Sequence, residues 1–156
     1  MQREKIDSYK RELLYRKAHG KVIFDKLKEK LSLLFPDEDD FTFLSLKETD
    51  EIVFHVNEKN ILIEDERAFF SYFDSIRYLN SNLRSCGYYL LLDEDWKYCG
   101  AIVLKSGFKI SENFDFDEVT SDEIRLISCD LKEKVSLDYS NSIGNEPFEC
   151  RFIRYG

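Results

Sequence analysis

The sequence predicts an α+β protein, in which N-terminal helical segments and one aromatic-rich helix pack on a mostly antiparallel β-sheet. The first 34 residues and residues 64–83 carry apolar side chains at helical spacing. Much of the remaining chain consists of short runs rich in aromatic and β-branched residues, which are typical of strands. Short turns join these runs, and parallel strands would need long crossovers, so the sheet is expected to be mainly antiparallel.

Residues 1–34 are expected to form helix, because apolar residues recur at steps of three to five with Lys, Arg and Glu between them. Gly20 interrupts this pattern and predicts a kink, or a break into two helices. The segment FPDEDD at 35–40 ends the helix with Pro36 and a run of carboxylates.

Two short strands are expected next, FTFLSL at 41–46 and EIVFHV at 51–56, because both are rich in aromatic and β-branched residues. The residues KETD between them suit a turn. After the polar stretch at 57–60, the residues ILI at 61–63 are a candidate third strand.

Residues 64–83 show the clearest helical pattern. An apolar stripe follows steps of three and four through Phe69, Tyr72, Phe73, Ile76, Leu79 and Leu83. Three carboxylates, Glu64, Asp65 and Glu66, would lie in the first turn, where the helix dipole favours negative charge. Such a stripe is typical of a helix that packs on a core.

A hairpin is predicted from the nearly continuous apolar runs at 87–92 and 97–104, joined by the tip DEDW at 93–96. Residues 108–119 are expected to form a strand that leads into an acidic loop. Residues 120–139 are ambiguous: a Thr-x-x-Glu capping pattern at 120–123 favours a helix, whereas later alternation favours a hairpin, which we prefer. A loop at 141–147 then precedes a last strand at 148–155.

The 156 residues suit a single domain, with a basic segment at 1–34 and an acidic body at 35–156. The first segment holds ten Lys and Arg against five Asp and Glu, and the body holds 13 against 26. The charged opening lacks the apolar stretch of a signal peptide, and no apolar run reaches the ~18 residues that span a bilayer. We therefore expect a cytoplasmic protein that does not enter membranes, with its four cysteines as free thiols.

Motifs for metal, cofactor or catalysis do not emerge. The run DFDEVTSDE beginning at Asp115 places Val119 and Thr120 where a calcium loop needs a ligand and a glycine. His19 and His55 stand alone, without the clustered His and Cys of a zinc site. Neither a nucleophile elbow nor a glycine-rich phosphate loop is present. These patterns predict no metal, no cofactor and no enzymatic activity.

Nucleic-acid binding is also not expected. Lys and Arg in the segment at 1–34 alternate with carboxylates at spacings typical of an ordinary solvated helix. The acidic body would oppose the approach of phosphates. The same charge attracts cationic partners instead.

The acidic clusters are therefore the candidate partner-binding residues. The candidates lie at the hairpin tip and in the following acidic loop: Asp93, Glu94, Asp95, Trp96, Asp115, Asp117, Glu118, Asp122 and Glu123. A third acidic run occupies 36–40. Carboxylates beside a tryptophan combine charge that steers a cationic partner with a side chain common in binding hot spots. Alternatively, each cluster only keeps a turn in water.

These observations favour an acidic inhibitor of a basic protein, in the concrete form of a bacterial immunity protein that covers the active site of a cationic toxin such as a nuclease domain. Two other hypotheses remain at this point. One is a small enzyme or ligand-binding domain with a pocket between the aromatic helix and the sheet. The other is a regulatory or scaffold subunit that dimerises through the helix at 64–83.

Overall fold

A computed structural model describes residues 2–140 and 145–156, with side chains from Asp7 onward. Four helices and seven strands make up this part of the chain. In order, they are α1 (Gln2–Leu34), β1 (Thr42–Phe43), α2 (Leu46–Asn57), β2 (Ile61–Phe69), α3 (Tyr72–Asn82), β3 (Tyr88–Leu92), α4 (Trp96–Cys99), β4 (Ile102–Leu104), β5 (Glu123–Ser128), β6 (Glu133–Tyr139) and β7 (Phe148–Tyr155).

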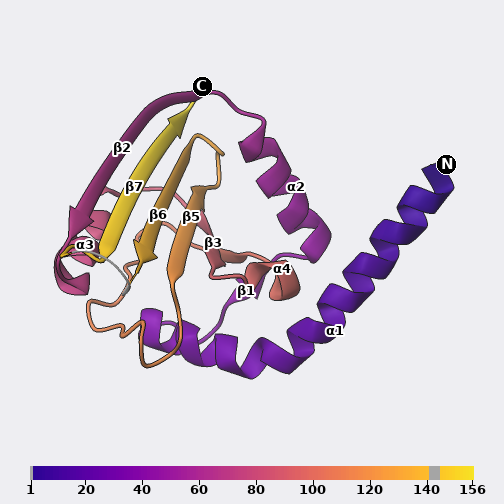
Figure 1. Cartoon of the computed structure of the whole chain (residues 1–156), viewed down its shortest axis with the longest axis horizontal. Coiled ribbons are helices and arrows are strands. Elements are labelled where there is room, and N and C mark those ends of the chain that lie inside the picture. Colours follow the sequence, from indigo (N-terminus) through magenta and orange to yellow (C-terminus); the bar gives the residue numbers. More distant parts are fainter. Residues whose placement is uncertain (1, 141–144) are drawn as a thin grey trace.

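All seven strands join one sheet in the order β1-β4-β3-β5-β6-β7-β2, and every neighbouring pair is antiparallel. Figure 1 shows α1 running along one end of the sheet, with its N-terminal part extending away from the strands. The predicted α+β class, with helices on a mostly antiparallel sheet, is confirmed.

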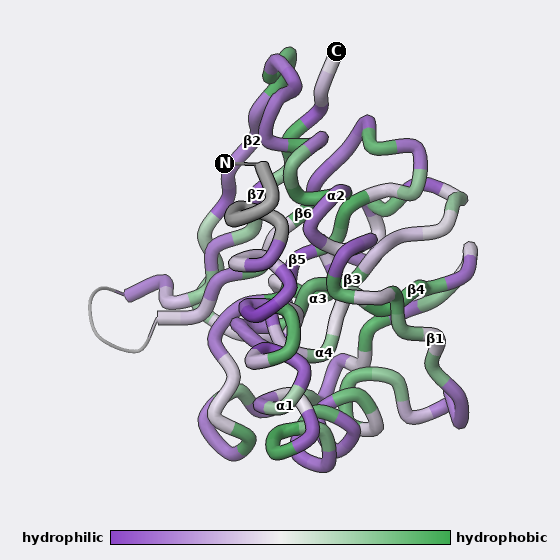
Figure 2. The backbone as a smooth tube through the Cα atoms, turned by 90° about the vertical axis from the view of Figure 1, so that its right-hand side faces the viewer, coloured by the Kyte–Doolittle hydropathy of each residue, from purple (hydrophilic) through white to green (hydrophobic). Residues whose placement is uncertain are grey.

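The main core lies on the face of the sheet that α3 and the C-terminal half of α1 cover. From α1 it takes Leu27, Leu31 and Leu34, and from α3 it takes Ile76 and Leu79. These side chains meet the inward residues of the strands, including Tyr88, Leu90, Leu92, Ile124, Leu126, Val135, Leu137 and Cys150. Figure 2 shows the hydrophobic character of strands β3 and β4, whereas α1 mixes hydrophilic and hydrophobic residues. Buried side chains thus fill the space between α3 and the sheet.

A second, smaller apolar cluster lies on the opposite face, beneath α2. Successive side chains of a strand point to opposite faces, so Leu91 and Ile127 leave the main core and meet Val56 of α2 here. Figure 1 shows α2 beside the sheet, on the side of β5 away from β6. The sheet is therefore covered by α1 and α3 on one face and partly by α2 on the other.

Helix α1 runs through Gly20 without interruption, so the predicted break into two helices is wrong. Figure 1 shows that α1 changes direction along its length. Gly20 is buried, and a Cβ atom built on it would lie 2.3 Å from the carbonyl oxygen of Tyr98. The Sγ atom of Cys99 also lies 3.6 Å from the Gly20 carbonyl oxygen. Glycine at this position lets α4 approach the α1 backbone closely.

The strand predicted at 51–56 is wrong, because these residues form most of α2. A capping box starts this helix: the Ser45 hydroxyl accepts from the Glu48 N–H, and the Glu48 carboxylate accepts from the Ser45 N–H. The apolar residues that resemble a strand also fit the face of a helix, since Val56 lies one turn beyond Ile52. Only β1, at Thr42–Phe43, remains of the two predicted strands.

The helix predicted over 64–83 begins later, at Tyr72, because the preceding residues belong to β2. Strand β2 pairs with β7 from Ile61 opposite Tyr155 to Phe69 opposite Phe148. The Ser71 hydroxyl then caps α3 by accepting from the Asp74 N–H at 3.2 Å. The acidic first turn predicted at 64–66 is therefore wrong, because the pairing with β7 places these carboxylates on a strand.

The remaining predictions are confirmed in part. Strands β3 and β4 form the predicted hairpin, but 96–99 form α4, and 108–119 contain turns and no strand. Strands β5 and β6 confirm the hairpin within 120–139, and β7 confirms the last strand. The loop predicted at 141–147 falls largely outside the described residues. Within the described chain, no helix has the length and apolar character needed to cross a membrane.

Candidate partner-binding site

The hairpin tip after β3 and the acidic loop before β5 line one pocket of about 510 Å³. We name it the acidic pocket. Its charged lining residues are Lys30, Asp93, Glu94, Asp95, Asp117 and Asp122. The fold thus brings together two acidic segments that are separate in the sequence, and it adds a lysine from α1.

Asp93 joins the tip to the loop. Its side chain is buried, with 8% of the residue exposed, and accepts hydrogen bonds from the Ser121 hydroxyl at 2.9 Å and from the N–H groups of Asp122 at 2.9 Å and Glu123 at 3.0 Å. The Lys30 ammonium lies 2.8 Å from its other oxygen. Asp93 therefore holds the loop, the tip and α1 in fixed positions.

The charge of Asp93 follows from these contacts. Burial acts to raise the pKa of Asp93, but the Lys30 ammonium and the N–H groups of Asp122 and Glu123 outweigh it, so the pKa lies below its ordinary value. For Asp122, by contrast, burial and the neighbouring negative charge of Asp93 both act to raise the pKa. The pocket thus contains one firmly ionised carboxylate beside one that takes up a proton more easily.

The other two carboxylates of the tip differ in their surroundings. The carboxylate of Asp95 is the second partner of Lys30, at 3.1 Å. Glu94 is exposed and forms an ion pair with Lys97, one turn along. A surface pair of this kind contributes little to stability, so the Glu94 carboxylate is available to a partner.

In the loop, Asp115 accepts from the N–H groups of Asp117 at 3.0 Å and Glu118 at 3.2 Å. The carboxylate of Asp117 accepts from the Tyr139 hydroxyl at 2.8 Å, which holds it at the rim of the acidic pocket. Glu118 is exposed and lines a neighbouring hollow between the loop and α1. Asp115 thus orders the loop, and Asp117 and Glu118 present charge.

Besides Asp115 and Glu118, two further candidates, Trp96 and Glu123, do not line the acidic pocket. The half-buried Trp96 packs against the second apolar cluster, and the Arg125 guanidinium lies 5.6 Å from the centre of its ring. Glu123 lies on the sheet, where its carboxylate forms an ion pair with Arg125 at 3.0 Å. Trp96 is the first residue of α4, and its ring packs against the second apolar cluster instead of lining the acidic pocket.

Sequence patterns did not identify Lys30, Ser121 or Tyr139 as parts of this site. Lys30 is one of many lysines in α1, and only the packing of that helix brings it to Asp93. The sequence TSDE at 120–123 does carry a signal for part of this site. Its capping pattern indicates backbone N–H groups that need a side-chain acceptor such as a carboxylate. Here that acceptor is Asp93, from another segment.

The described residues contain no group of three or more His, Cys, Asp or Glu placed to hold a metal ion. His55 is exposed on α2, and the His19 ring packs against Tyr98 with ring centres 4.4 Å apart. The acidic run at 36–40 is exposed and lines no part of the acidic pocket. Comparison with protein-family models, curated proteins and solved structures found no match.

The outward carboxylates at and beside the acidic pocket are Glu94, Asp117, Glu118 and Asp122. Among the described residues that line the acidic pocket itself, the one lysine is Lys30, and it is already paired with Asp93 and Asp95. Such an arrangement attracts cationic groups over roughly a Debye length, about 8–10 Å. A side chain ending in an ammonium or guanidinium group is the chemistry that suits it.

Proposed function

We propose that this protein is an acidic inhibitor that binds a basic protein through the acidic pocket. The most concrete form is a bacterial immunity protein that covers the active site of a cationic toxin, such as a nuclease domain. The observation that carries the proposal is the convergence of the tip at 93–95 and the loop at 115–123 around one hollow of about 510 Å³. Asp93 holds both segments from within, so the outward carboxylates do not have to be ordered on binding.

The carboxylates would take the place of substrate phosphates against Lys and Arg of the toxin. Glu94, Asp117 and Asp122 face outward and are the residues that we assign to this contact. Asp93 and Asp95 share Lys30 and have a structural role in the site. Charge pairing of this kind raises association rates to about 10⁸ M⁻¹s⁻¹ at low salt, with a steep fall as salt increases.

The test is a pull-down with the tagged protein at low and at moderately high salt, with partners identified by mass spectrometry. We expect one basic protein that is retained at low salt and weakened by salt. A retained toxin domain is then assayed for its activity with and without this protein. Retention of no basic protein at either salt would contradict the proposal.

A matched pair of variants separates the pocket from overall charge. Glu94→Gln, Asp117→Asn and Asp122→Asn are combined in one variant, and Asp37→Asn, Glu38→Gln and Asp39→Asn in the control. Both remove three negative charges from exposed positions. The first variant should bind the partner more slowly and with a weaker salt dependence, and the control should bind almost as the unmodified protein does. Equal effects of the two variants would show that net charge, and not the acidic pocket, attracts the partner.

A further inference from the structure

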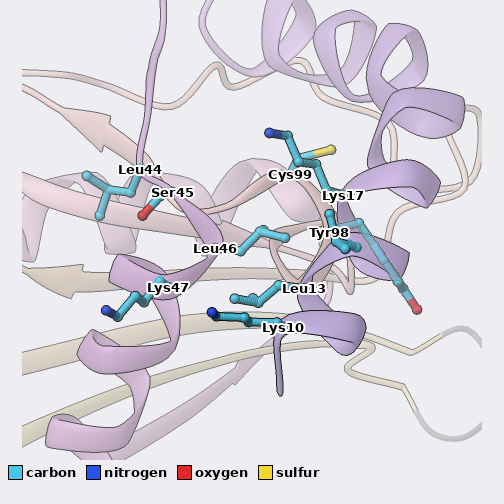
Figure 3. A pocket seen from close by; sticks show the side chains of 10 residues that line it. Lys10, Leu13, Lys17, Leu44, Ser45, Leu46, Lys47, Tyr98 and Cys99 are labelled. Carbon is cyan, nitrogen blue, oxygen red and sulfur yellow. The ribbon is translucent and has the colours of Figure 1, made fainter. Parts of the chain in front are cut away.

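A second pocket, of about 540 Å³, lies between the N-terminal half of α1, the start of α2 and α4 (Figure 3). We name it the α1–α2 pocket. Its apolar lining comes from Leu13, Leu14, Leu44, Leu46 and the side chain of Tyr98. Three lysines, Lys10, Lys17 and Lys47, complete it, and Figure 3 shows their side chains around Leu13 and Leu46. An apolar lining with cationic groups at its edge suits a ligand that is both apolar and anionic.

The three lysines have no carboxylate partner among the side chains that the structure describes. This contrasts with Arg16, which lies on the same helix between Lys10 and Lys17 and is paired with Asp50. The chain as a whole carries a net charge of −8, because its Asp and Glu residues outnumber its Lys and Arg residues. Unpaired ammonium groups gathered at one apolar hollow are therefore a local reversal of the charge of the molecule.

The walls of the pocket are held in place by contacts just outside it. The Arg16 guanidinium donates two hydrogen bonds of 2.8 Å to the Asp50 carboxylate and one of 2.6 Å to the Lys97 carbonyl oxygen. The Tyr9 hydroxyl also donates to Asp50, at 2.7 Å. These bonds connect α1, α2 and α4. A ligand thus meets a preformed site and loses little affinity to ordering it.

We propose that the α1–α2 pocket binds an amphipathic monoanion, an aliphatic chain that ends in a carboxylate. The chain would lie on the leucines, and the carboxylate would meet the ammonium groups of Lys10, Lys17 and Lys47. The volume falls within the range of small-molecule sites, about 300–1,000 Å³. A small ligand is favoured over an acidic helix of a partner, because stable protein interfaces cover about 800 Å² on each side, much more than one such hollow.

Titration with dodecanoate, kept below its micelle concentration, tests this proposal by calorimetry and by methyl NMR of the leucines. We expect one molecule bound per chain, with shifts at Leu13, Leu14, Leu44 and Leu46. Dodecyltrimethylammonium has the same chain length and a cationic head, and it should bind at least about tenfold more weakly. The net negative charge of the protein would by itself favour the cationic ligand. Tighter binding of the anionic ligand would therefore be due to the lysines of the pocket. Equal or tighter binding of the cationic ligand would overturn the proposal.

Variants localise the effect. Combining Lys10→Gln, Lys17→Gln and Lys47→Gln should weaken dodecanoate binding by about tenfold at low salt. The control combines Lys21→Gln, Lys105→Gln and Lys109→Gln, which removes the same charge from exposed positions outside the pocket, and it should bind as the unmodified protein does. Leu14 is 69% exposed, so Leu14→Gln should weaken binding without unfolding the protein.

Three further results would overturn the proposal. The first is no dodecanoate binding to the unmodified protein, and the second is equal weakening by the two lysine triples. The third is binding of a Leu- and Glu-rich helical peptide at these leucines without dodecanoate binding, which would assign the pocket to a protein segment. The acidic pocket is not involved, so each outcome stands apart from the inhibitor proposal.

Discussion

Asp93 shows how one residue can organise a surface without being displayed on it. Its backbone φ of 50° is in the left-handed region, which Asp, Asn and Gly adopt more readily than other residues. This conformation turns the chain after β3, and the Asp95 N–H donates to the Leu92 carbonyl oxygen at 3.0 Å. The same residue neutralises Lys30 and accepts from the loop. The three carboxylates of the tip therefore divide into two that bind inward and one, Glu94, that faces the solvent.

Replacing Asp93 should strongly destabilise the fold. Asp93→Ala leaves Lys30 with Asp95 alone and removes the acceptor of the loop N–H groups, so we expect a loss of about 2–4 kcal/mol in the free energy of unfolding. Asp93→Asn tolerates the positive φ and keeps one acceptor, so its loss should be smaller. Urea unfolding measures both, with exposed Asp37→Ala as a control. Equal stability of the Ala variant and the unmodified protein would show that Asp93 does not hold the loop.

Gly20 should resist replacement although it lies within a helix. Alanine ordinarily stabilises a helix by about 1 kcal/mol relative to glycine. Here the new Cβ would lie 2.3 Å from the Tyr98 carbonyl oxygen, so α1 and α4 would have to separate. We expect Gly20→Ala to lower the free energy of unfolding by about 1–3 kcal/mol, measured by urea unfolding. A stabilised Gly20→Ala protein would contradict this close approach.

At the scale of elements, α2 illustrates how a short cap overrides strand-like composition. The hydroxyl of Ser45 and the carboxylate of Glu48 satisfy each other's N–H groups, and the buried Thr49 hydroxyl accepts from the Ala101 N–H at 2.9 Å. The cap fixes the start of α2, and the Thr49–Ala101 hydrogen bond fixes its position beside the start of β4. Lys47, which lines the α1–α2 pocket, is placed by the same turn.

Removing the cap should weaken α2 measurably. Ser45→Ala loses the acceptor for the Glu48 N–H, so we expect the free energy of unfolding to fall by about 1 kcal/mol. Ser32→Ala is a suitable control, because its exposed hydroxyl only donates to the Lys28 carbonyl within α1. Circular dichroism during urea unfolding gives both values. No difference between the two variants would show that the capping box contributes nothing to α2.

Across the whole molecule, the partly buried carboxyls fall into two sets, whose pKa values shift in opposite directions. Burial raises the pKa of Glu123, Glu133 and Asp138, although nearby arginines partly oppose it. Burial acts in the same direction on Asp93 and Asp50, but Lys30 and Arg16 outweigh it and leave their pKa values lowered. These two sets respond to acid in opposite ways.

The free energy of unfolding should therefore pass through a maximum in weak acid. A carboxyl whose pKa is raised on folding binds its proton more readily in the folded state, so stability rises as the pH falls from 7 through that value. A carboxyl whose pKa is lowered stabilises the fold above its ordinary value of 3.8, and this contribution is lost as the pH falls below it. Urea unfolding at several pH values measures the curve.

A variant tests whether the carboxyls with raised pKa values cause the change in stability between pH 7 and weak acid. Glu123→Gln removes one of the raised groups, so it should reduce the rise in stability between pH 7 and weak acid. A stability that falls steadily from pH 7 downward would contradict the expected maximum.

Features that depend on neighbouring residues follow from local sequence patterns alone. Apolar spacing of three and four indicated the helix at 1–34, and alternation indicated the strands that became β5, β6 and β7. The class of fold followed from these elements and their short turns. The acidic segments at 93–95 and 115–123 were also evident, since charge is a property of composition.

Long-range packing sets where these segments meet and which way they face. Residues 64–69 were expected to begin the helix, with three carboxylates in its first turn, but they pair with β7, which lies far away in the sequence. The inward position of Asp93 depends on Lys30 and Ser121, and no local pattern connects these three residues. Local patterns extend over about one helical turn or one strand, whereas sheet pairing and buried ion pairs join residues across the whole chain. Both pockets are products of that long-range packing.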